Sequence, residues 1–164
     1  MSLTHERLLE VLTYNKRTGL FRWKERNSNR VEVGDVAGTP HPSGYVRISI
    51  DRRFYYAHRL AVFYVTGEWP PVKVDHRDLV RNNNRWRNLR CANNSQNGGN
   101  AKLSSANTSG FKGVSWDSRR KVWRAQIRID WQNRFLGYFS AEADAAKAYK
   151  AAAIESFGEF ARAA

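Results

Sequence analysis

The sequence predicts an α+β fold in two modules, and three patterns support this prediction. Residues 46–50 alternate apolar and polar side chains, which is typical of a strand with one buried face. Residues 141–156 are rich in alanine and favour a helix. Residues 101–110 are small or polar with one apolar exception, as linkers commonly are. We therefore expect one domain over residues 1–100 and another over residues 111–164.

The first module is expected to begin with a helix and to continue as short strands. Thr4 is a candidate N-cap for a run of leucines at helical spacing, and the Thr18–Gly19 turn precedes a strand. A turn at Asp51–Arg53 joins two strands into a hairpin, and a half-buried helix then stops at Thr66–Gly67. The expected elements are helix 5–13, strand 20–24, strand 46–50, strand 54–56 and helix 58–65.

A pair of strands followed by a short helix is expected over residues 72–100. The first strand, 72–76, ends in two polar side chains, and a loop rich in Arg and Asn follows it. Residues 88–92 are predicted to form the return strand. Asn94 is a candidate cap for a helix over residues 95–102.

The second module is expected to be a three-stranded antiparallel sheet packed on one helix. Ser140 is the candidate N-cap of that helix, and Gly158 ends it. Side chains alternate along the middle strand, so its apolar residues face the helix while Arg124, Gln126 and Arg128 face outward. The strands are predicted at residues 113–116, 122–129 and 134–139.

The composition indicates an intracellular protein that binds a polyanion. Lys and Arg number 28 against 15 acidic residues, which gives a net charge of +13. Such an excess favours nucleic acid as the partner, with an anionic membrane surface second. No apolar stretch reaches the length of about 18 residues that a membrane-spanning helix needs, and residues 1–12 lack the apolar core of a signal peptide. The single cysteine, Cys91, excludes a disulfide framework and is predicted to be a small buried residue.

Asp75, His76, Asn88 and Asn97 are the residues best suited to chemistry. Hydrolysis of a phosphodiester needs a base for the attacking water and positive charge near the leaving oxygen. His76 is the candidate base, and Asn88, across the strand pair, is expected to hold its imidazole in the working tautomer. Asp75 offers a carboxylate and Asn97 an amide oxygen, both suited to Mg²⁺ or Mn²⁺. A lone Asp–His pair is commonly solvated or structural, so the whole pattern has to support the site.

Residues 44–100 resemble the HNH endonuclease family, in particular the branch found in phage-type homing endonucleases. This resemblance implies a ββα-metal motif at about residues 72–100, with His76 as general base and Asn88 orienting it. It also implies that Asp75 and Asn97 bind one divalent cation, although many relatives have His in place of Asn97. The residues that carry the resemblance are Asp75-His76, the run NRWRNLR at 84–90, Ser95-Gln96-Asn97, and the flanking His58-Arg59-Leu60 and Gly67 to Pro70.

Several further residues are open to two interpretations. His58 packs as a structural residue on a half-buried helix or, alternatively, contacts a DNA phosphate near the site. The arginines of the loop either clamp the DNA backbone around the scissile bond or form a solvated basic surface; they are Arg81, Arg85, Arg87 and Arg90. His5 and His41 are given no function.

Residues 111–162 are similar to the APETALA2-type DNA-binding domain of plant transcription factors. The matching runs are FKGV at 111–114, WRAQIR at 123–128, FLGYF at 135–139 and the helix ADAAKAY at 143–149. The resemblance implies that the sheet lies in the major groove of duplex DNA. It implies a base-reading face made of Ser115, Gln126, Arg128, Asn133 and Phe135. Nearby arginines are expected to hold phosphates and set the register; they are Arg119, Arg120, Arg124 and Arg134. Ser115, Asp117 and Asn133 stand where the plant proteins usually carry Arg, so their target sequence does not transfer.

Together these features predict a site-specific DNA endonuclease of the homing type. We expect it to act as a monomer on double-stranded DNA, in the cytoplasm of a bacterium or a phage-infected host. No membrane and no protein partner are expected to take part. One alternative is a non-catalytic DNA-binding regulator that keeps the HNH segment as a scaffold. A second is an RNA-binding protein, although a sheet face rich in Arg rather than in aromatic residues favours duplex DNA.

Overall fold

Four small sheets and four α-helices build the part of the chain that the computed structural model describes, residues 3–26 and 28–162. The mixed α+β class is therefore confirmed. The chain divides into two compact units, Met1–Cys91 and Ala92–Ala164. The boundary between the units thus lies at residues 91–92, before the linker predicted at residues 101–110. The outermost residues of the predicted domains, 1–2 and 163–164, lie outside the described residues.

The first unit begins with the expected helix, which is shorter than predicted. In α1, His5–Val11, the Thr4 hydroxyl accepts a hydrogen bond from the backbone N–H of Arg7 at 3.2 Å, which confirms the N-cap. The helix stops early because the next residues pair in antiparallel register with β2 to form β1. That pairing satisfies backbone groups that a longer helix would have had to satisfy itself. The strands of this sheet are β1 (Leu12–Tyr14), β2 (Phe21–Trp23) and β3 (Val36–Ala37).

A hairpin and a helix complete the scaffold of the first unit. Asp51 and Arg52 form the predicted turn, with positive φ angles of 49° and 63°. Positive φ at both positions matches a type I′ turn, whose twist suits the flanking strands. Gly67, in the left-handed conformation, ends the helix as predicted. The elements are β4 (Thr39–Pro40), β5 (Val46–Ile50), β6 (Arg53–Tyr56) and α2 (Ala57–Thr66).

The apolar faces of these elements meet in one core. Val74 and Leu89, from the predicted strand pair, belong to the same core. The side chains that are almost completely excluded from solvent include Leu8, Leu12, Phe21, Ile48, Ile50 and Leu60. Burying one such side chain contributes about 1.5–3 kcal/mol. The core therefore fixes α2 and β5 against each other. His58 lies on α2 and Tyr45 directly precedes β5, and both are neighbours of the candidate site.

The predicted strand pair is present as β7 (Lys73–His76) and β8 (Leu89–Ala92), with the short 3-10 helix η1 (Trp86–Asn88) before β8. Cys91 is exposed, so the prediction that it is buried was wrong. Successive side chains of a strand point to opposite faces. Arg90 takes the buried position because it pairs with the buried Asp75, and Cys91 then faces solvent.

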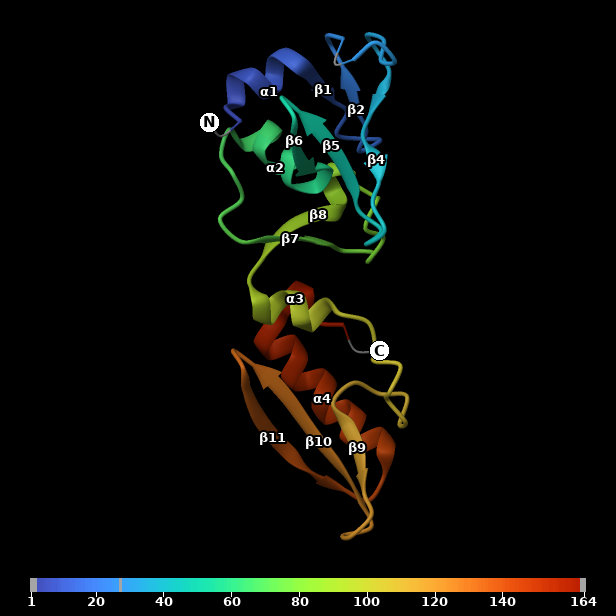
Figure 1. Cartoon of the computed structure of the whole chain (residues 1–164). Helices are drawn as coiled ribbons and strands as arrows, with labels where there is room; N and C mark the ends of the chain where they lie inside the picture. The colour runs from blue at the N-terminus through green and yellow to red at the C-terminus, as the bar shows by residue number, and fades with distance from the viewer. Residues whose placement is uncertain (1–2, 27, 163–164) are drawn as a thin grey trace. The chain divides into compact units, whose positions relative to one another are not determined.

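The second unit contains the predicted three-stranded sheet with one helix across it (Figure 1, orange and red). The strands lie in the order β11-β10-β9, and all pair antiparallel. Their bounds are β9 (Val114–Asp117), β10 (Val122–Ile129) and β11 (Gln132–Phe139). A register shift between Ala125 and Gln126 interrupts the pairing of β10 with β11.

Helix α4 (Glu142–Phe157) covers the apolar face of this sheet. Ala145 and Ala153 are almost completely buried, and small side chains there let the helix lie close to Ala125 and Ile127 of β10. The predicted cap at Ser140 was wrong. Ala141 is the N-cap and makes no side-chain hydrogen bond.

Helix α3 (Asn94–Asn100) belongs to the second unit, which moves the boundary away from the predicted linker. Asn93 rather than the predicted Asn94 caps it, in a capping box with Gln96. A Cβ at Gly99 would lie 2.7 Å from the ring of Phe157, so the helix can approach α4 only because this residue is glycine. The Lys112 amine donates to the Gly99 carbonyl at 2.7 Å.

The predicted linker is itself folded at its C-terminal end. The side-chain amide of Asn107 donates to the Phe111 carbonyl at 2.9 Å, and the Ser109 hydroxyl donates to the Val114 carbonyl at 2.9 Å. Small polar residues predicted flexibility here, but their side chains satisfy the backbone of a tight turn instead. Across the described residues, no helix combines the length and apolarity needed to cross a bilayer.

Candidate active site and nucleic-acid interface

His76, at the end of β7, is buried and held by a side chain of the following loop. Its Nε2 lies 3.1 Å from Oδ1 of Asn84, which is buried as well. An amide oxygen can only accept, so Nε2 carries the proton and donates it to Asn84. The basic nitrogen of this imidazole is then Nδ1. The structure thus selects one tautomer of the candidate base.

Asn84 is braced from the N-terminal part of the first unit. Its backbone carbonyl accepts a hydrogen bond from the Tyr14 hydroxyl at 2.6 Å. The next turn is fixed by a hydrogen bond from the Trp86 N–H to the Lys16 carbonyl at 2.9 Å. Gly19 has φ +77°, and a Cβ there would collide with the backbone of Asn84. The orientation of His76 therefore depends on a loop clamped by residues about 70 positions earlier in the sequence.

Asn88 holds the loop that follows β7. Its amide nitrogen donates to the Asp78 carboxylate at 2.9 Å and to the Asn83 carbonyl at 2.7 Å, and its Oδ1 accepts from the Asp78 N–H at 3.1 Å. Asn84 makes a hydrogen bond with Nε2 of the imidazole, and the bond expected from Asn88 to the other ring nitrogen stays a prediction. Asn84 is the residue that the sequence did not single out, since it is one of three consecutive asparagines and composition does not tell them apart.

The surroundings of His76 keep it neutral. Burial lowers the pKa of His76 below its usual value, and this outweighs the opposite effects of the Asn84 hydrogen bond and of Asp78 and Asp75. Burial raises the pKa of Asp78, but hydrogen bonds from Asn83, the Val80 N–H and Asn88 together bring it below its usual value. A neutral imidazole beside the ionised Asp78 carboxylate is a competent proton acceptor near neutral pH.

His58, at the start of α2, packs directly against His76. The two ring centroids are 5.2 Å apart, and the Tyr45 ring lies 4.7 Å from His58 and 5.9 Å from His76. His58 is 7% exposed, and its Nδ1 has no hydrogen-bond partner among the described residues. The burial of this side chain matches the structural interpretation of His58.

Acid is expected to destabilise the first unit through His58. Burial, with smaller effects from His76 and Arg59, lowers the pKa of His58 from 6.5 to about 3. The unfolded chain therefore binds a proton that the folded chain excludes, and stability is lost as the pH falls from 6.5 towards 3. The slope from this group is at most about 1.4 kcal/mol per pH unit. Denaturant unfolding of wild type and His58→Gln across this range should show a shallower slope for the variant; equal slopes would contradict the assignment.

Asp75 forms a buried ion pair that the sequence did not predict. The Nε and Nη2 atoms of Arg90 both lie 2.9 Å from Oδ2 of Asp75, and the two residues are 9% and 6% exposed. Arg90 was expected with the backbone-clamping arginines, but its guanidinium is committed to this carboxylate. The sequence does not reveal this ion pair, because residues 75 and 90 become neighbours only when β7 pairs with β8.

The donor chemistry of the expected metal site fits a hard divalent cation. Asp75 provides a carboxylate and Asn97 an amide oxygen, which are ligand types that Mg²⁺ and Mn²⁺ accept. Asp75 belongs to the first unit and Asn97, on α3, to the second. Within residues 3–26 and 28–162, no three His, Cys, Asp or Glu side chains gather into a metal cluster.

The remaining arginines of the loop face solvent. Arg81, Arg85 and Arg87 are exposed. Arg81 is also oriented: its Nη1 donates to the Ser43 carbonyl at 2.7 Å, and its guanidinium lies 5.2 Å from the centre of the Tyr45 ring. The loop that follows His76 thus presents three cationic side chains to solvent.

In the second unit, the register of the sheet brings the predicted base-reading residues onto one face. Residues opposite each other on paired strands share a face. Arg124 of β10 lies opposite Ser115 of β9. Gln126 and Arg128 follow Arg124 on the same face of β10. The pairs with β11 are Arg124 with Tyr138, Gln126 with Phe135, and Arg128 with Asn133.

This outer face carries aromatic as well as cationic groups. Phe135 is 51% exposed and Tyr138 44%, and their rings pack at 4.9 Å. Tyr138 was not predicted as part of the face; its alternation with Phe135 is hidden by the register shift on β11. Arg120, which bonds Asp117, lies 5.2 Å from the Tyr138 ring. Arg124 is exposed on the same face, and Arg119 is exposed in the turn between β9 and β10, so this surface is cationic. Arg134 is exposed as well, but it pairs with Ile127, which is buried in the core with α4, so the register places Arg134 on the opposite face.

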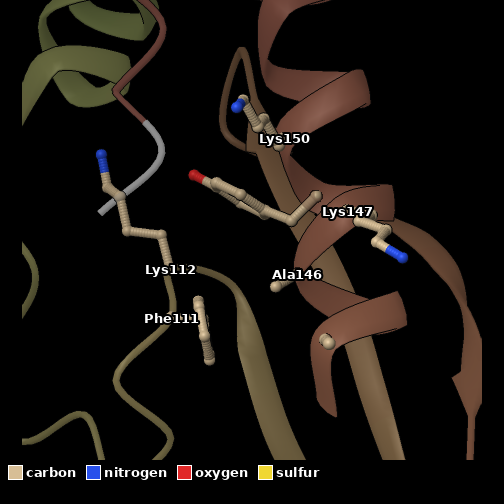
Figure 2. Close-up of a pocket in the computed structure, with 7 residues that line it drawn as sticks. Phe111, Lys112, Ala146, Lys147 and Lys150 are labelled. Carbon is tan, nitrogen blue, oxygen red and sulfur yellow. The ribbon is translucent and has the colours of Figure 1, made fainter. Parts of the chain in front are cut away.

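A separate cavity of about 310 Å³ lies on the α4 side of the second unit. Figure 2 shows Phe111 and Ala146 with three lysines, Lys112, Lys147 and Lys150, around it. Lys112 donates to backbone carbonyls of α3, and Lys147 pairs with an acidic residue one helical turn away. Two of these cations are thus engaged by the protein itself, and the cavity is separate from the outer face of the sheet.

Comparison with known proteins matches part of this chain. Residues 55–98 match the family model of the HNH endonuclease domain. A 57-residue segment is 39% identical to Protein 3.8 of Escherichia phage T7 and covers 35% of this chain and 47% of that protein. The match thus spans about half the length of that relative. No solved structure matches the chain significantly.

The family match begins in β6 and ends in α3, so it crosses the boundary between the two units. It leaves residues 1–54 uncovered, and the predicted extension of the HNH domain to residue 1 is not supported by it. Asp75, His76 and Asn88 lie inside the matched range with Asn97. Residues 55–98 are therefore similar to an HNH endonuclease domain, and this similarity indicates nuclease or DNA-binding activity for the segment that holds the buried His76.

Proposed function

We propose that the protein is a site-specific DNA endonuclease of the homing type. The observation that carries this proposal is the buried, neutral His76, fixed in one tautomer by Asn84 inside the segment that matches an HNH endonuclease. The net charge of +13 suits a polyanionic substrate. The phage relative supports a setting in the cytoplasm of a bacterium or a phage-infected cell, where the protein acts as a monomer on double-stranded DNA.

In this proposal His76 acts as the general base. Nε2 donates to Asn84, so Nδ1 takes a proton from water as the water oxygen bonds to phosphorus. The bond from phosphorus to the 3′ oxygen breaks, and that oxygen takes up a proton. The products are a 5′-phosphate and a 3′-hydroxyl, as the resemblance to HNH endonucleases implies. Asn84, through its clamped loop, and Asn88, through Asp78, position the base.

Asp75 and Asn97 are the residues proposed to hold one divalent cation, Mg²⁺ or Mn²⁺. When bound, such an ion stabilises negative charge that develops on the leaving oxygen. Arg90 orients the Asp75 carboxylate within the buried pair. The exposed Arg81, Arg85 and Arg87 bind backbone phosphates beside the scissile bond.

The outer face of the second unit is proposed to supply most of the sequence recognition, as in the APETALA2-type domain. Ser115, Gln126, Arg128, Asn133 and Phe135 would contact base edges in the major groove. Arg119, Arg120 and Arg124 would contact phosphates, whereas Arg134, paired with the buried Ile127, lies on the other face. The support is the shared face set by the strand register and the exposed cations around it.

A plasmid assay tests the proposal against its alternatives. Purified protein with supercoiled plasmid and Mg²⁺ should produce nicked or linear DNA, and EDTA should stop the reaction. A regulator that keeps the HNH segment as a scaffold would bind the plasmid and leave it supercoiled. Competition with single-stranded RNA should displace duplex DNA poorly; efficient displacement would favour the RNA-binding alternative.

Arg128→Ala is expected to relax base preference at one position of the target and to cost about 1–3 kcal/mol of binding, as for a bidentate contact with guanine. Arg120→Ala is the matched control, since its guanidinium lies beside Tyr138 and Asp117 at the end of the face. It should weaken all sequences alike and flatten the salt dependence. Selection from a random duplex library, followed by sequencing, measures both; a uniform loss with Arg128→Ala would remove it from base readout.

A further inference from the structure

The β10–β11 hairpin ends in a turn that places a large aromatic side chain at its tip. Ile129 pairs with Gln132, so Asp130 and Trp131 form a two-residue turn with φ angles of 47° and 69°. This is a type I′ pattern, in which glycine is strongly preferred at the second position. Tryptophan there adopts a backbone conformation that L-residues other than Gly, Asn and Asp rarely use.

Trp131 gains little from the protein in return for this conformation. It is 72% exposed, more than any other large apolar side chain among residues 3–26 and 28–162. The Arg128 guanidinium lies over its ring, 5.2 Å from the ring centre. A strained residue that the fold does not bury is a candidate for contact with a ligand.

The turn is also anchored. The backbone N–H of Asp130 donates to the Ser95 hydroxyl of α3 at 3.0 Å, across 35 residues of sequence. This bond fixes the hairpin tip, and hence Trp131, against the rest of the second unit. An aromatic side chain held in one place contributes contact area at a low entropic cost.

A cavity of about 330 Å³ lies beneath Trp131. That volume falls in the range of small-ligand sites, about 300–1,000 Å³. Phe157 and Trp131 provide apolar and aromatic surface, while Asn94, Ser95, Asp130 and Arg128 provide donors and acceptors. A flat, partly polar ring fits this combination better than an aliphatic group, because it uses both the stacking surface and the hydrogen-bonding groups.

We propose that Trp131 stacks on a single unpaired nucleobase of duplex DNA, which enters this cavity next to the base-reading face. Arg128 belongs to the base-reading face and also lines the cavity, so the two share this side chain. The inference rests on the proposed binding of DNA by the second unit. It adds a contact with a base that has left the stack, which major-groove reading does not require.

The test compares two 20-base-pair duplexes, one fully paired and one with a single extra adenine unpaired at its centre. Unstacking costs less when the base is already unpaired, so the full-length protein should bind the bulged duplex more tightly. The expected ratio of dissociation constants is about 5 to 150, the range of one stacking contact. Fluorescence anisotropy at fixed salt measures it.

Trp131→Gly should abolish this preference without weakening the fold, because glycine adopts the positive φ at no cost. The unfolding midpoint should stay at or above that of wild type; should the variant fail to fold, Trp131→Asn provides the same test with a residue tolerant of this φ. Trp131→Phe keeps a ring and should keep part of the preference. Arg52→Gly makes the same backbone change in the hairpin of the first unit, φ 63°, and should keep all of it.

The outcomes separate this inference from the proposed function. Equal affinity of wild type for the two duplexes, or an unchanged preference in a folded Trp131→Gly, overturns the stacking site while DNA binding stands. Failure to bind either duplex removes the proposed DNA interface itself.

Discussion

His76→Ala is expected to slow DNA cleavage by about 10²–10⁴-fold, the usual loss when a general base is removed. Duplex affinity should hardly change, because a neutral imidazole contributes nothing to the charge of +13 that attracts DNA. Single-turnover cleavage and equilibrium binding, measured on the same duplex, separate the two effects.

Two companion variants sharpen this experiment. His5→Ala is the matched control, since His5 bonds the Tyr64 carbonyl and packs on Phe63 away from the candidate base, and it should cleave like wild type. Asn84→Ala removes the acceptor of His76 Nε2 and should fall between the two. Cleavage by His76→Ala within threefold of wild type would exclude His76 from the mechanism.

Arg90→Ala is expected to destabilise the first unit by about 3–5 kcal/mol, the typical cost of removing one partner of a buried ion pair. Asp75 would be left 6% exposed without the two contacts at 2.9 Å that balance its charge. Urea unfolding measures this loss directly. Arg87→Ala is the matched control: it removes an exposed arginine nearby and should change stability by no more than about 0.5 kcal/mol.

A double variant then separates stability from function. Replacing both partners, Asp75→Leu with Arg90→Met, should recover much of the lost stability, because an apolar pair of similar volume often matches a buried ion pair. The same protein should remain unable to cleave DNA. If Arg90→Ala unfolds at the same urea concentration as wild type, the pair is not the buried contact described here.

Regular elements were predictable because local patterns decide them. The alternation at 46–50 and 122–129 gave strands with the correct faces, and the alanine-rich segment gave α4 within one residue at each end. The end of α1 was missed because it depends on pairing with β2, which helical spacing alone does not encode. Strands β3 and β4 were missed for the same reason. Each is two residues long and is defined by its pairing with a neighbouring strand.

The candidate site was predictable in its residue types but not in its partners. Asp75 and His76 stand out as an adjacent acid and base at a strand end. Which asparagine reaches the imidazole depends on how the loop of residues 77–88 folds back, and Tyr14 and Gly19 decide that from outside the motif. A pattern of nearby residues carries no information about such distant braces.

Composition misled where small polar residues do structural work. The segment 101–110 has the make-up of a flexible chain, yet Asn107 binds back to Phe111 within the second unit. Gly99 was given no role from the sequence, yet its lack of a side chain is what admits the Phe157 ring. In both cases the decisive contact is with a residue that local composition does not identify.

The boundary between Cys91 and Ala92 also bears on how such a protein can change in evolution. Here the compact second unit begins at Ala92, and the segment similar to HNH endonucleases runs on to residue 98. A recombination event that replaced the second unit at its structural edge would carry Asn97 and the rest of that segment with it. The second unit therefore cannot be exchanged at this edge without dividing the segment similar to HNH endonucleases.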